Sequence, residues 1–307
     1  MARAASPGAA PAHGVLLLDK PAGITSTRAL TSAKRLVQAP KAGHTGTLDP
    51  FATGLLPLVF GEAAKFSRFL LEAPKTYEAT LRLGEETASG DPECPVTRAS
   101  AVAATAGEID AVLRSFLGAQ QQIPPMHSAL HVAGRRLYDY ARAGEEVARI
   151  PRAIAISDIA ALGRTGDDLA IRVTCSKGTY VRTLAQDIGR RLGCGAHLVA
   201  LRRTAVGHLS LANALTLEQL ESLGPVARDA LLPPEALVAA LPRFDASDPE
   251  AAGFVHGRPI ATSGAAGAEV AVYAPGGRFV GVGAVFPDRI APLRLLSPPA
   301  AKLPDFA

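Results

Sequence analysis

The sequence predicts an α+β protein in which helices flank a central mixed, mainly antiparallel sheet, followed by a small β domain. Segments with apolar residues at alternate positions, typical of strands, are interspersed with segments whose apolar residues recur at helical spacing. The chain has 307 residues, enough for a large domain, predicted at 14–241, and a small one at 242–307. After Pro242 the composition shifts to Gly, Val and Ala, with turns such as residues 275–277 between short strands.

The elements follow from local patterns. The predicted strands are residues 15–18, 55–60, 76–83, 154–162, 169–175, 197–206, 270–273, 279–285 and 293–296. The predicted helices are residues 26–39, 62–73, 107–117 and 183–192. Thr25 or Ser26 is expected to cap the first helix, and Thr216 to open a capping box. Pro57 predicts an irregular or edge position for its strand, because proline cannot donate to a ladder. Residues 84–97, polar and punctuated by Gly and Pro, predict a loop.

Composition limits the class of protein. A hydrophobic content of 48% and a charged content of 20% are typical of soluble globular proteins. Cys94, Cys175 and Cys194 lack C-x-x-C spacing, which favours neither disulfides nor a zinc site and fits a reducing cytosol. Residues 1–13 lack the apolar segment of a signal peptide and are expected to be a disordered lead-in. No apolar run reaches the roughly 18 residues of a membrane span.

Basic residues are unevenly distributed, although the net charge of +4 is mild. Residues 172–203 contain seven basic residues and one acid, Asp187, a surplus of +6. The basic residues are Arg172, Lys177, Arg182, Arg190, Arg191, Arg202 and Arg203. Such a window can form a phosphate-binding face, or simply a solvated helix face.

Residues 120–152, called the insertion below, are irregular and partly basic. Its arginines are Arg135, Arg136, Arg142, Arg149 and Arg152. Tyr138 and Tyr140 lie among these charges. A long insertion in a compact domain is more often functional than idle, and the alternative is an ordinary surface helical hairpin.

Residues 43–56 form a Gly-punctuated loop that runs into an apolar segment. Gly43, Gly46 and Gly54 permit close backbone approach, and a single carboxylate, Asp49, lies among two Thr hydroxyls and an imidazole. Such an Asp can be a nucleophile, a general base or a metal ligand, or part of an ordinary turn. Metal binding usually needs a second carboxylate close by, and this stretch has none, so no metal site is predicted.

This loop resembles the motif G-H-x-G-x-L-D-P-x-A-x-G-x-L of the TruB family of tRNA pseudouridine synthases. The matching residues are Gly43, His44, Gly46, Leu48, Asp49, Pro50, Ala52, Gly54 and Leu55. Further blocks agree in order, namely residues 19–26, 75–77, 176–183 and 201–203. The resemblance covers about residues 15–208, and the C-terminal part faintly resembles the PUA-like domains that end many such synthases.

The resemblance implies an enzyme that isomerises uridine to pseudouridine at position 55 in the tRNA T-loop. The reaction breaks the N1–C1′ bond and joins C5 to C1′, with no redox step, so no cofactor is expected. Asp49 would be the nucleophile or base, acting at C1′, at C6 or through a glycal, on a uridine flipped out of its stack. The insertion would grip the T-arm in place of a guide RNA, in a cytoplasmic monomer without an obligatory protein partner.

The resemblance also implies roles for individual residues. The catalytic residues would be Asp49, Tyr77, which stacks on the base, and Arg182, which pairs with Asp49. Residues expected at the substrate or the RNA are His44, Lys20, Lys65, Tyr180, Asp91 and Arg202. For Lys20, support of the Asp49 loop is the alternative. Lys65 is the second candidate for the cation that keeps Asp49 ionised. Asp91 would bond the uracil edge, although residues 88–91 depart from the family's T-D-T-x-D.

Three alternatives remain open from the residues. An RNA-binding module without catalysis would explain the basic window but would leave Asp49 without a role. A metal-dependent hydrolase would be inhibited by chelators. The eukaryotic and archaeal relatives use guide RNAs, and the insertion favours a stand-alone enzyme over them.

Overall fold

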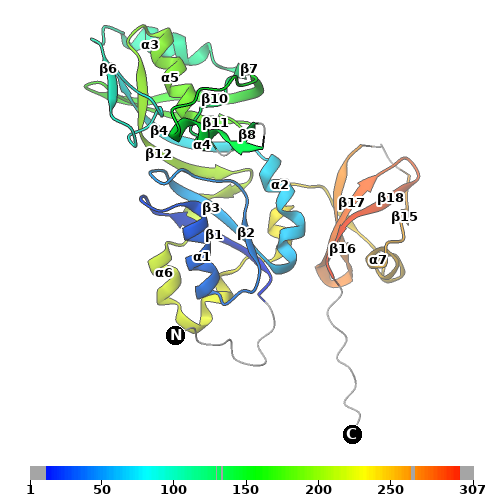
Figure 1. Cartoon of the computed structure of the whole chain (residues 1–307). Coiled ribbons are helices and arrows are strands. Elements are labelled where there is room, and N and C mark those ends of the chain that lie inside the picture. Colours follow the sequence, from blue (N-terminus) through cyan, green and yellow to red (C-terminus); the bar gives the residue numbers. More distant parts are fainter. Residues whose placement is uncertain (1–11, 129, 133, 264–266, 298–307) are drawn as a thin grey trace.

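The structure is a computed structural model that describes residues 12–128, 130–132, 134–263 and 267–297. A nine-stranded sheet has the order β1-β3-β12-β4-β11-β10-β7, with β2 beside β3 and β13 beside β12 (Figure 1). Its strands are β1 (Gly14–Lys20), β2 (Ala42–His44), β3 (Thr53–Phe60), β4 (Lys75–Leu83), β7 (Gly118–Gln122), β10 (Arg152–Thr165), β11 (Asp168–Cys175), β12 (Ala196–Val206) and β13 (Leu209–Ser210). Among the described strand pairs of this sheet, only β3 and β12 are parallel, so the predicted mainly antiparallel sheet is confirmed.

Helices cover the sheet as the apolar patterns require. The helices of this domain are α1 (Ser26–Leu36), η1 (Gly61–Phe66), α2 (Ser67–Glu72), α3 (Ala106–Arg114), α4 (Leu137–Arg142), α5 (Val181–Arg191), α6 (Leu217–Ser222), η2 (Leu211–Asn213), η3 (Gly224–Ala230) and η4 (Pro234–Leu237). Thr25 caps α1 by accepting from the Arg28 amide, and Thr216 opens a capping box, as predicted. No helix within the described ranges is long and apolar enough to cross a membrane.

The core lies on both faces of β1 and β3. Leu16 and Leu18 pack into the cluster with α1, α5 and α6, whereas Val15 and Leu17 pack on the opposite face with η1 and η4. Burial on both faces explains the continuous apolar run of β1. On β4 the buried residues alternate with partly exposed ones, as the sequence pattern predicts.

One expectation about local structure is correct in part and another is wrong. Pro57 lies on an interior strand and not at an edge, but its position is irregular, because β3 pairs with β12 at residues 53–54 and with β2 at residues 58–60. Its missing donor is tolerated beside the end of β2, where the Pro57 carbonyl accepts from the Thr45 amide at 3.1 Å. Residues 84–97 are not all loop, because β5 (Glu85–Thr87) and β6 (Val96–Ala99) form a hairpin with Asp91 between them.

The expected lead-in falls mostly on residues 1–11, which lie outside the described residues. Its last two residues belong to the fold. Ala12 is buried in the main core, and the His13 Nδ1 accepts from the Glu62 amide at 3.0 Å.

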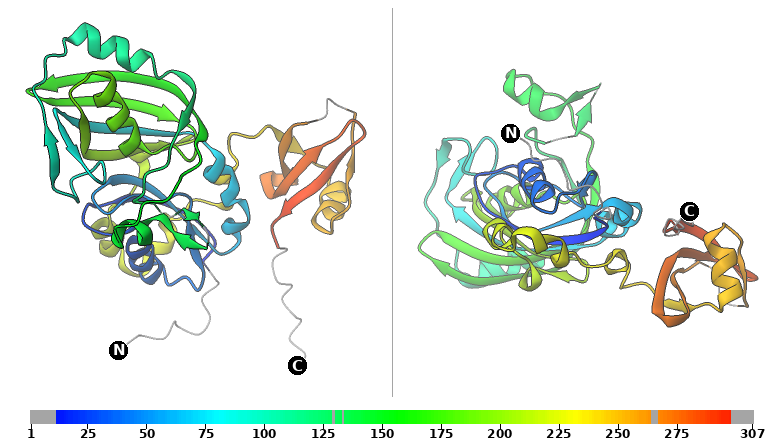
Figure 2. Two further views of the ribbon diagram at one scale, coloured as in Figure 1. Left: turned by 45° about the horizontal axis from the view of Figure 1, so that its top comes forward. Right: turned by 90° about the horizontal axis from the view of Figure 1, so that it is seen from below.

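The insertion leaves the sheet and returns to it. Gln120–Gln122 belong to the edge strand β7, which pairs with the start of β10, so the excursion comprises residues 123–151. The excursion contains β8 (His131–Val132), β9 (Arg135–Arg136) and α4. Two of its arginines lie over tyrosine rings, Arg135 over Tyr140 at 4.4 Å and Arg142 over Tyr138 at 4.9 Å. The excursion projects from the sheet in Figure 2.

A second sheet follows, in the order β14-β16-β17-β18-β15. Its elements are β14 (Arg243–Asp245), α7 (Asp248–Val255), β15 (Ile260–Ala261), β16 (Glu269–Ala274), η5 (Pro275–Gly277), β17 (Arg278–Val285) and β18 (Arg289–Leu295). The patterns missed α7, which a Ser247 capping box opens. The second sheet and α7 form a C-terminal unit that lies beside α2 in Figure 2. The ring of Phe279 in this unit is 5.2 Å from the ring of Phe66 in η1.

Candidate active site

The loop that carries Asp49 is held by buried hydrogen bonds. The Ser26 hydroxyl accepts from the Leu48 amide at 2.8 Å and donates to the Leu48 carbonyl at 2.9 Å. The Ala52 amide donates to the Asp49 carbonyl at 3.1 Å. Gly54 is required where the loop joins β3, because a Cβ there would lie 2.3 Å from the carbonyl oxygen of Arg203. The backbone on either side of Asp49 is therefore fixed.

Lys20 supports this loop from inside the protein. Its side chain is fully buried, and its ammonium donates to the carbonyls of Pro21, Ile24 and Pro50. Burial lowers the pKa of Lys20 to about 8, opposed by the charge of Asp49. The expectation of an RNA contact is wrong for Lys20, because a fully buried amine cannot reach a phosphate; the alternative, loop support, is what the geometry shows.

The guanidinium of Arg182 lies beside the Asp49 carboxylate. Arg182 is the second residue of α5, its side chain is 7% exposed, and its Nε lies 3.0 Å from Oδ2 of Asp49. Its Nη2 also donates to Asp49 Oδ1 at 3.4 Å. The two-point contact matches the planar fork of arginine, which a lysine cannot reproduce.

The Arg182 guanidinium also donates to two other segments. Nη1 donates to Oδ2 of Asp91 at 3.1 Å and to the Ser89 carbonyl at 3.3 Å. Nη2 donates to the His127 carbonyl at 2.9 Å. One buried guanidinium thus joins the Asp49 loop, the β5–β6 hairpin and the stem of the insertion.

Asp91 is an ion-pair partner of Arg182 and is 2% exposed. Its Oδ1 accepts from the Ser89 hydroxyl at 2.6 Å and from the Glu93 amide at 3.0 Å. Both oxygens therefore have partners within the protein. This arrangement orients Arg182, a function that the sequence-based expectation of a uracil contact did not include.

Opposing effects act on the Asp49 carboxyl. Burial raises its pKa, the charge and hydrogen bond of Arg182 lower it, and the charge of Asp91 raises it. The Asp49 side chain remains 35% exposed, so the carboxylate is open to a substrate while its partner is buried. The net effect is a raised pKa, so Arg182 offsets only part of the effect of burial, as expected of a nucleophile or base in a desolvated site.

Tyr77 lies on β4 opposite Arg203 of β12. Its side chain is buried, and burial raises the pKa of the phenol, opposed by the charge and hydrogen bond of Arg203. Asp49 also acts on this phenol by its charge. The two side chains are therefore close enough for the charge of Asp49 to raise the pKa of the Tyr77 phenol.

Arg203 is a site residue that sequence reasoning missed. It is 1% exposed, and its guanidinium donates to the carbonyls of Leu55 at 2.7 Å and Gly46 at 3.0 Å. These bonds tie both ends of the Asp49 loop to β12. The sequence pattern that could have indicated this role is the alternation of side chains along a strand, which places Arg202 and Arg203 on opposite faces.

His44 ends β2 at the start of the loop. Burial and the charge of Arg203 lower its pKa, which favours the neutral imidazole. Its buried Nδ1 has no hydrogen-bond partner among the described residues.

Among the described residues, no hydrogen bond or ion pair joins Asp49 to the remaining expected site residues, Lys65, Arg202 and Tyr180. The expectation that Lys65 keeps Asp49 ionised is wrong, because its ammonium contacts Glu62, the Leu295 carbonyl and the Ser297 hydroxyl. Arg202 forms an ion pair with Asp19 at 2.7 Å. Tyr180 is half-buried and immediately precedes α5. Within the described ranges no three His, Cys, Asp or Glu side chains are grouped as metal ligands.

Family models match nearly the whole chain. The model described as "TruB family pseudouridylate synthase (N terminal domain)" matches residues 34–181. Two C-terminal models, "tRNA pseudouridylate synthase B C-terminal domain" and "Pseudouridine synthase II TruB, C-terminal", match residues 182–239 and 242–296. The chain belongs to the TruB family. It is therefore a pseudouridine synthase, an isomerase.

Relatives and solved structures agree with this assignment. The chain is 55% identical to "tRNA pseudouridine synthase B" of Dechloromonas aromatica (strain RCB), over 88% of the chain and 90% of the relative. It is 50% identical to the protein of that name from Azoarcus sp. (strain BH72), over 92% of the chain and 95% of the relative. Among solved structures, an "H/ACA RNP bound to a substrate RNA containing 2'-deoxyuridine" matches with a TM-score of 0.72 and 25% identity, over 93% of this chain and 86% of that one. A "Cbf5-Nop10-Gar1 Complex" matches with a TM-score of 0.72 and 27% identity, over 94% and 86%.

Proposed function

We propose that this TruB-family chain converts the uridine at position 55 in the T-loop of tRNA to pseudouridine. The observation that carries the proposal is the half-exposed Asp49 carboxylate, held on the buried Arg182 in a loop that matches the family motif. The curated relatives at 50–55% identity are named for tRNA, which supports tRNA as the substrate.

In the proposed mechanism Asp49 acts as nucleophile or base on a uridine flipped into the site. A stacked base is out of reach of the Asp49 carboxylate, so the uridine must leave the helix stack. Tyr77, whose phenol is close enough to Asp49 to be affected by its charge, would offer an aromatic face for the flipped base and a phenol for proton transfer. Arg182 keeps Asp49 charged while the base excludes water. The reaction is redox-neutral, and we expect it to need neither a cofactor nor a metal.

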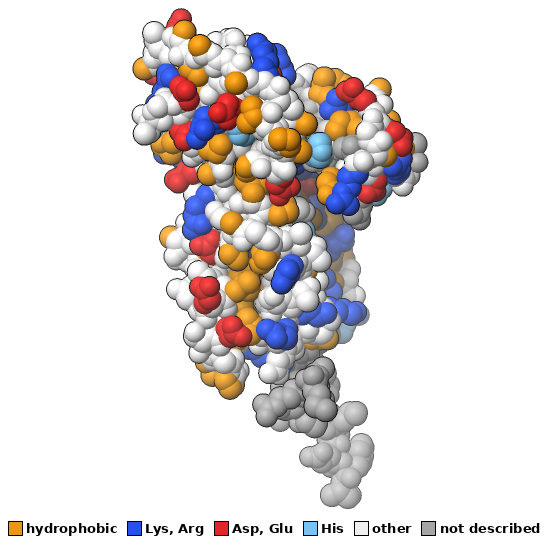
Figure 3. Space-filling model, turned by 60° about the vertical axis from the view of Figure 1, so that its left-hand side comes forward, with side chains coloured by type: hydrophobic (Ala, Val, Ile, Leu, Met, Phe, Trp, Pro, Cys, Tyr) orange, Lys and Arg blue, Asp and Glu red, His pale blue; other side chains and the backbone are white. Residues whose placement is uncertain are grey.

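RNA binding would depend on surfaces outside the pocket. The excursion at residues 123–151 carries Arg135 and Arg142 beside tyrosines, a combination that suits phosphates and exposed bases. In the lower half of the face in Figure 3, basic side chains gather along one edge and acidic ones along the other. Such an asymmetry suits a polyanionic partner.

We further propose a stand-alone cytoplasmic enzyme that acts as a monomer without a guide RNA or an obligatory protein partner. The matched structures at 25–27% identity are ribonucleoprotein or protein complexes by title, whereas the tRNA-named relatives are about twice as similar in sequence. The thiols of Cys94, Cys175 and Cys194 are free, which fits a reducing compartment.

The test is to incubate the purified chain alone with an unmodified tRNA transcript and to map pseudouridine chemically. We expect one new pseudouridine, at position 55, and tritium release from substrate carrying tritium at uracil C5. A transcript with cytidine at that position should be unmodified, and a chelator should have no effect. Modification only after adding a guide RNA would refute the stand-alone proposal, and modification at another position would refute the target.

A further inference from the structure

The segment just before Arg182 is held by a side chain from a distant strand. Gln122, the last residue of β7, is 4% exposed, and its amide makes two hydrogen bonds to one residue. Its Oε1 accepts from the Tyr180 amide at 2.8 Å, and its Nε2 donates to the Tyr180 carbonyl at 3.1 Å. The side chain therefore pairs with the Tyr180 backbone as a neighbouring strand would.

The contact lies where α5 has no other side-chain cap. Tyr180 is the N-cap residue of α5, and its own side chain makes no capping hydrogen bond. Amides at the start of a helix need partners from outside the helix. Gln122 satisfies the Tyr180 amide, and Arg182 follows two residues later in the first turn.

The same segment of chain also reaches the guanidinium itself. Five residues after Gln122, the His127 carbonyl accepts from Nη2 of Arg182 at 2.9 Å. The end of β7 thus holds the backbone two residues before Arg182, through Gln122, and the start of the excursion holds the guanidinium, through His127. Gln122 is in turn fixed by pairing with Arg152 of β10.

The chemistry of an amide suits this position. Only an uncharged side-chain amide offers one acceptor and donors in the same plane, to match a backbone N–H and C=O together. A glutamate would place a carboxylate oxygen against the Tyr180 carbonyl, and a methionine would fill the space without either bond.

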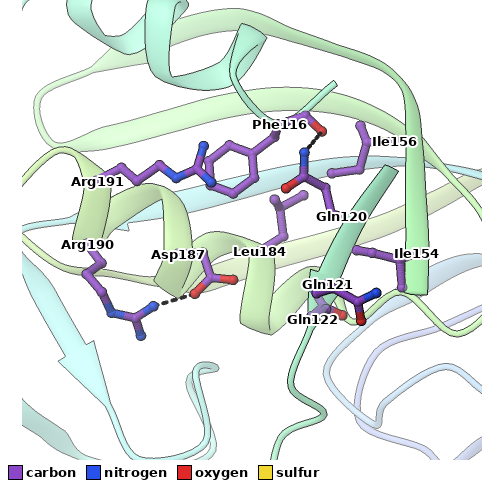
Figure 4. Close-up of a pocket in the computed structure, with 10 residues that line it drawn as sticks. All are labelled: Phe116, Gln120, Gln121, Gln122, Ile154, Ile156, Leu184, Asp187, Arg190 and Arg191. Atoms are coloured by element: carbon purple, nitrogen blue, oxygen red, sulfur yellow. Dashed lines mark hydrogen bonds and ion pairs between the residues drawn. The ribbon is translucent and has the colours of Figure 1, made fainter. Parts of the chain in front are cut away.

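Three consecutive glutamines provide an internal comparison. Gln120, Gln121 and Gln122 all line a pocket of about 250 Å³ between β7, β10 and α5 (Figure 4). Gln120 donates to the Phe116 carbonyl at 3.3 Å, and Gln121 is exposed. Gln122 is the member of this run that contacts the residue before α5.

We propose that Gln122 is a positioning residue for the Asp49–Arg182 pair, because its amide fixes the backbone from which Arg182 reaches Asp49. This inference rests on the proposed function of that pair. Gln122 makes no contact with Asp49 itself, so its effect passes through Arg182. A displacement of the guanidinium by about 1 Å can lower a rate up to about 100-fold.

The test compares Gln122→Met with Gln121→Met under single-turnover conditions, across pH 6 to 9. We expect Gln122→Met to lower kcat about 10- to 100-fold with little change in KM, because the lost contact orients the catalytic pair and touches no RNA. The loss should be greater at pH 6 than at pH 9, because a displaced Arg182 no longer opposes the burial that raises the pKa of Asp49. Gln121→Met should behave as the wild type.

A merely structural role would give a different result. It would lower the melting temperature and leave the kcat of the folded enzyme and its pH profile unchanged, and that outcome overturns the proposal. If Gln122→Met does not fold, Gln122→Glu replaces it in the test, because glutamate keeps the shape and the acceptor but loses the donor. A wild-type kcat of Gln122→Glu at pH 8 would then overturn the proposal.

The Asp49→Asn variant separates this inference from the proposed function. If Asp49→Asn is inactive and Gln122→Met keeps the kcat and the pH profile of the wild type, only the role of Gln122 is refuted. If Asp49→Asn remains active, the role of the pair is refuted first, and the proposal for Gln122 falls with it.

Discussion

Replacing Arg182 by methionine tests the central electrostatic argument. Methionine keeps much of the volume and removes the charge that lies 3.0 Å from Asp49. At an effective dielectric constant of 20, two unit charges at that distance interact by about 5 kcal/mol. Because Asp49 is 35% exposed, solvent screening reduces this value, and we expect about 3 kcal/mol to remain. That corresponds to a loss of about 100-fold in kcat.

The loss should depend on pH with a definite sign. Burial raises the pKa of Asp49 and Arg182 lowers it, so removing Arg182 raises the pKa further. A smaller fraction of Asp49 is then ionised at low pH, and the acidic limb of the kcat profile moves to higher pH. The variant should therefore recover part of its activity as the pH rises.

Single-turnover tritium release, measured from pH 6 to 9, provides the assay. Arg164→Met is a matched control, because Arg164 lies at the β10–β11 turn and pairs with Asp167. A loss that is equal at every pH, with a raised KM and a shallower salt dependence of binding, would refute the reasoning. Arg182 would then bind RNA, and the second cation beside Asp49, Lys20, would keep it ionised.

Three further predictions follow from other parts of the chain. Asp49→Asn should abolish product while tRNA binding, measured by filter retention, stays close to wild type; turnover within tenfold of wild type would refute its role. Replacing Arg135 and Arg142 with glutamine should lower the log–log salt slope of tRNA binding by up to about two units, because each phosphate contact contributes about one. Phe279→Ala should destabilise the chain by about 3–5 kcal/mol in denaturant unfolding, because the ring packs on the fully buried Phe66; an unchanged midpoint would show that this interface contributes nothing.

The sheet and most of its helices could be predicted because their apolar periods are strong and local. Tyr77, for example, lies on the buried face of β4 as alternation predicts. Pro57 indicated an irregular or edge position, and only the first is correct, because local chemistry shows that a donor is missing but not which neighbouring strand ends beside it. The helix α7 was missed because its apolar residues lie together in residues 251–255 and do not recur at helical spacing.

The composition of the site was predictable only in part. The motif locates Asp49 and Arg182, but the partners of Arg182 come from residues 89–91 and from His127, which are brought together by long-range packing. Lys65 was the second candidate for the cation beside Asp49, but the sequence does not show which way its helix faces. The structure turns it toward Ser297 instead, since η1 faces the C-terminal unit.

The charge balance of the site explains why Arg182 is so thoroughly anchored. Asp91 is 2% exposed and would be costly as an unpaired anion, and its charge raises the pKa of Asp49. A single guanidinium between the two carboxylates satisfies the buried one and stabilises the exposed one. Its rotation toward Asp91 alone would leave Asp49 without its nearest cation. The His127 carbonyl and the Gln122 contact to Tyr180 oppose that rotation from the side chain and from the backbone, so the orientation of Arg182 depends on the edge of the sheet as much as on the catalytic loop.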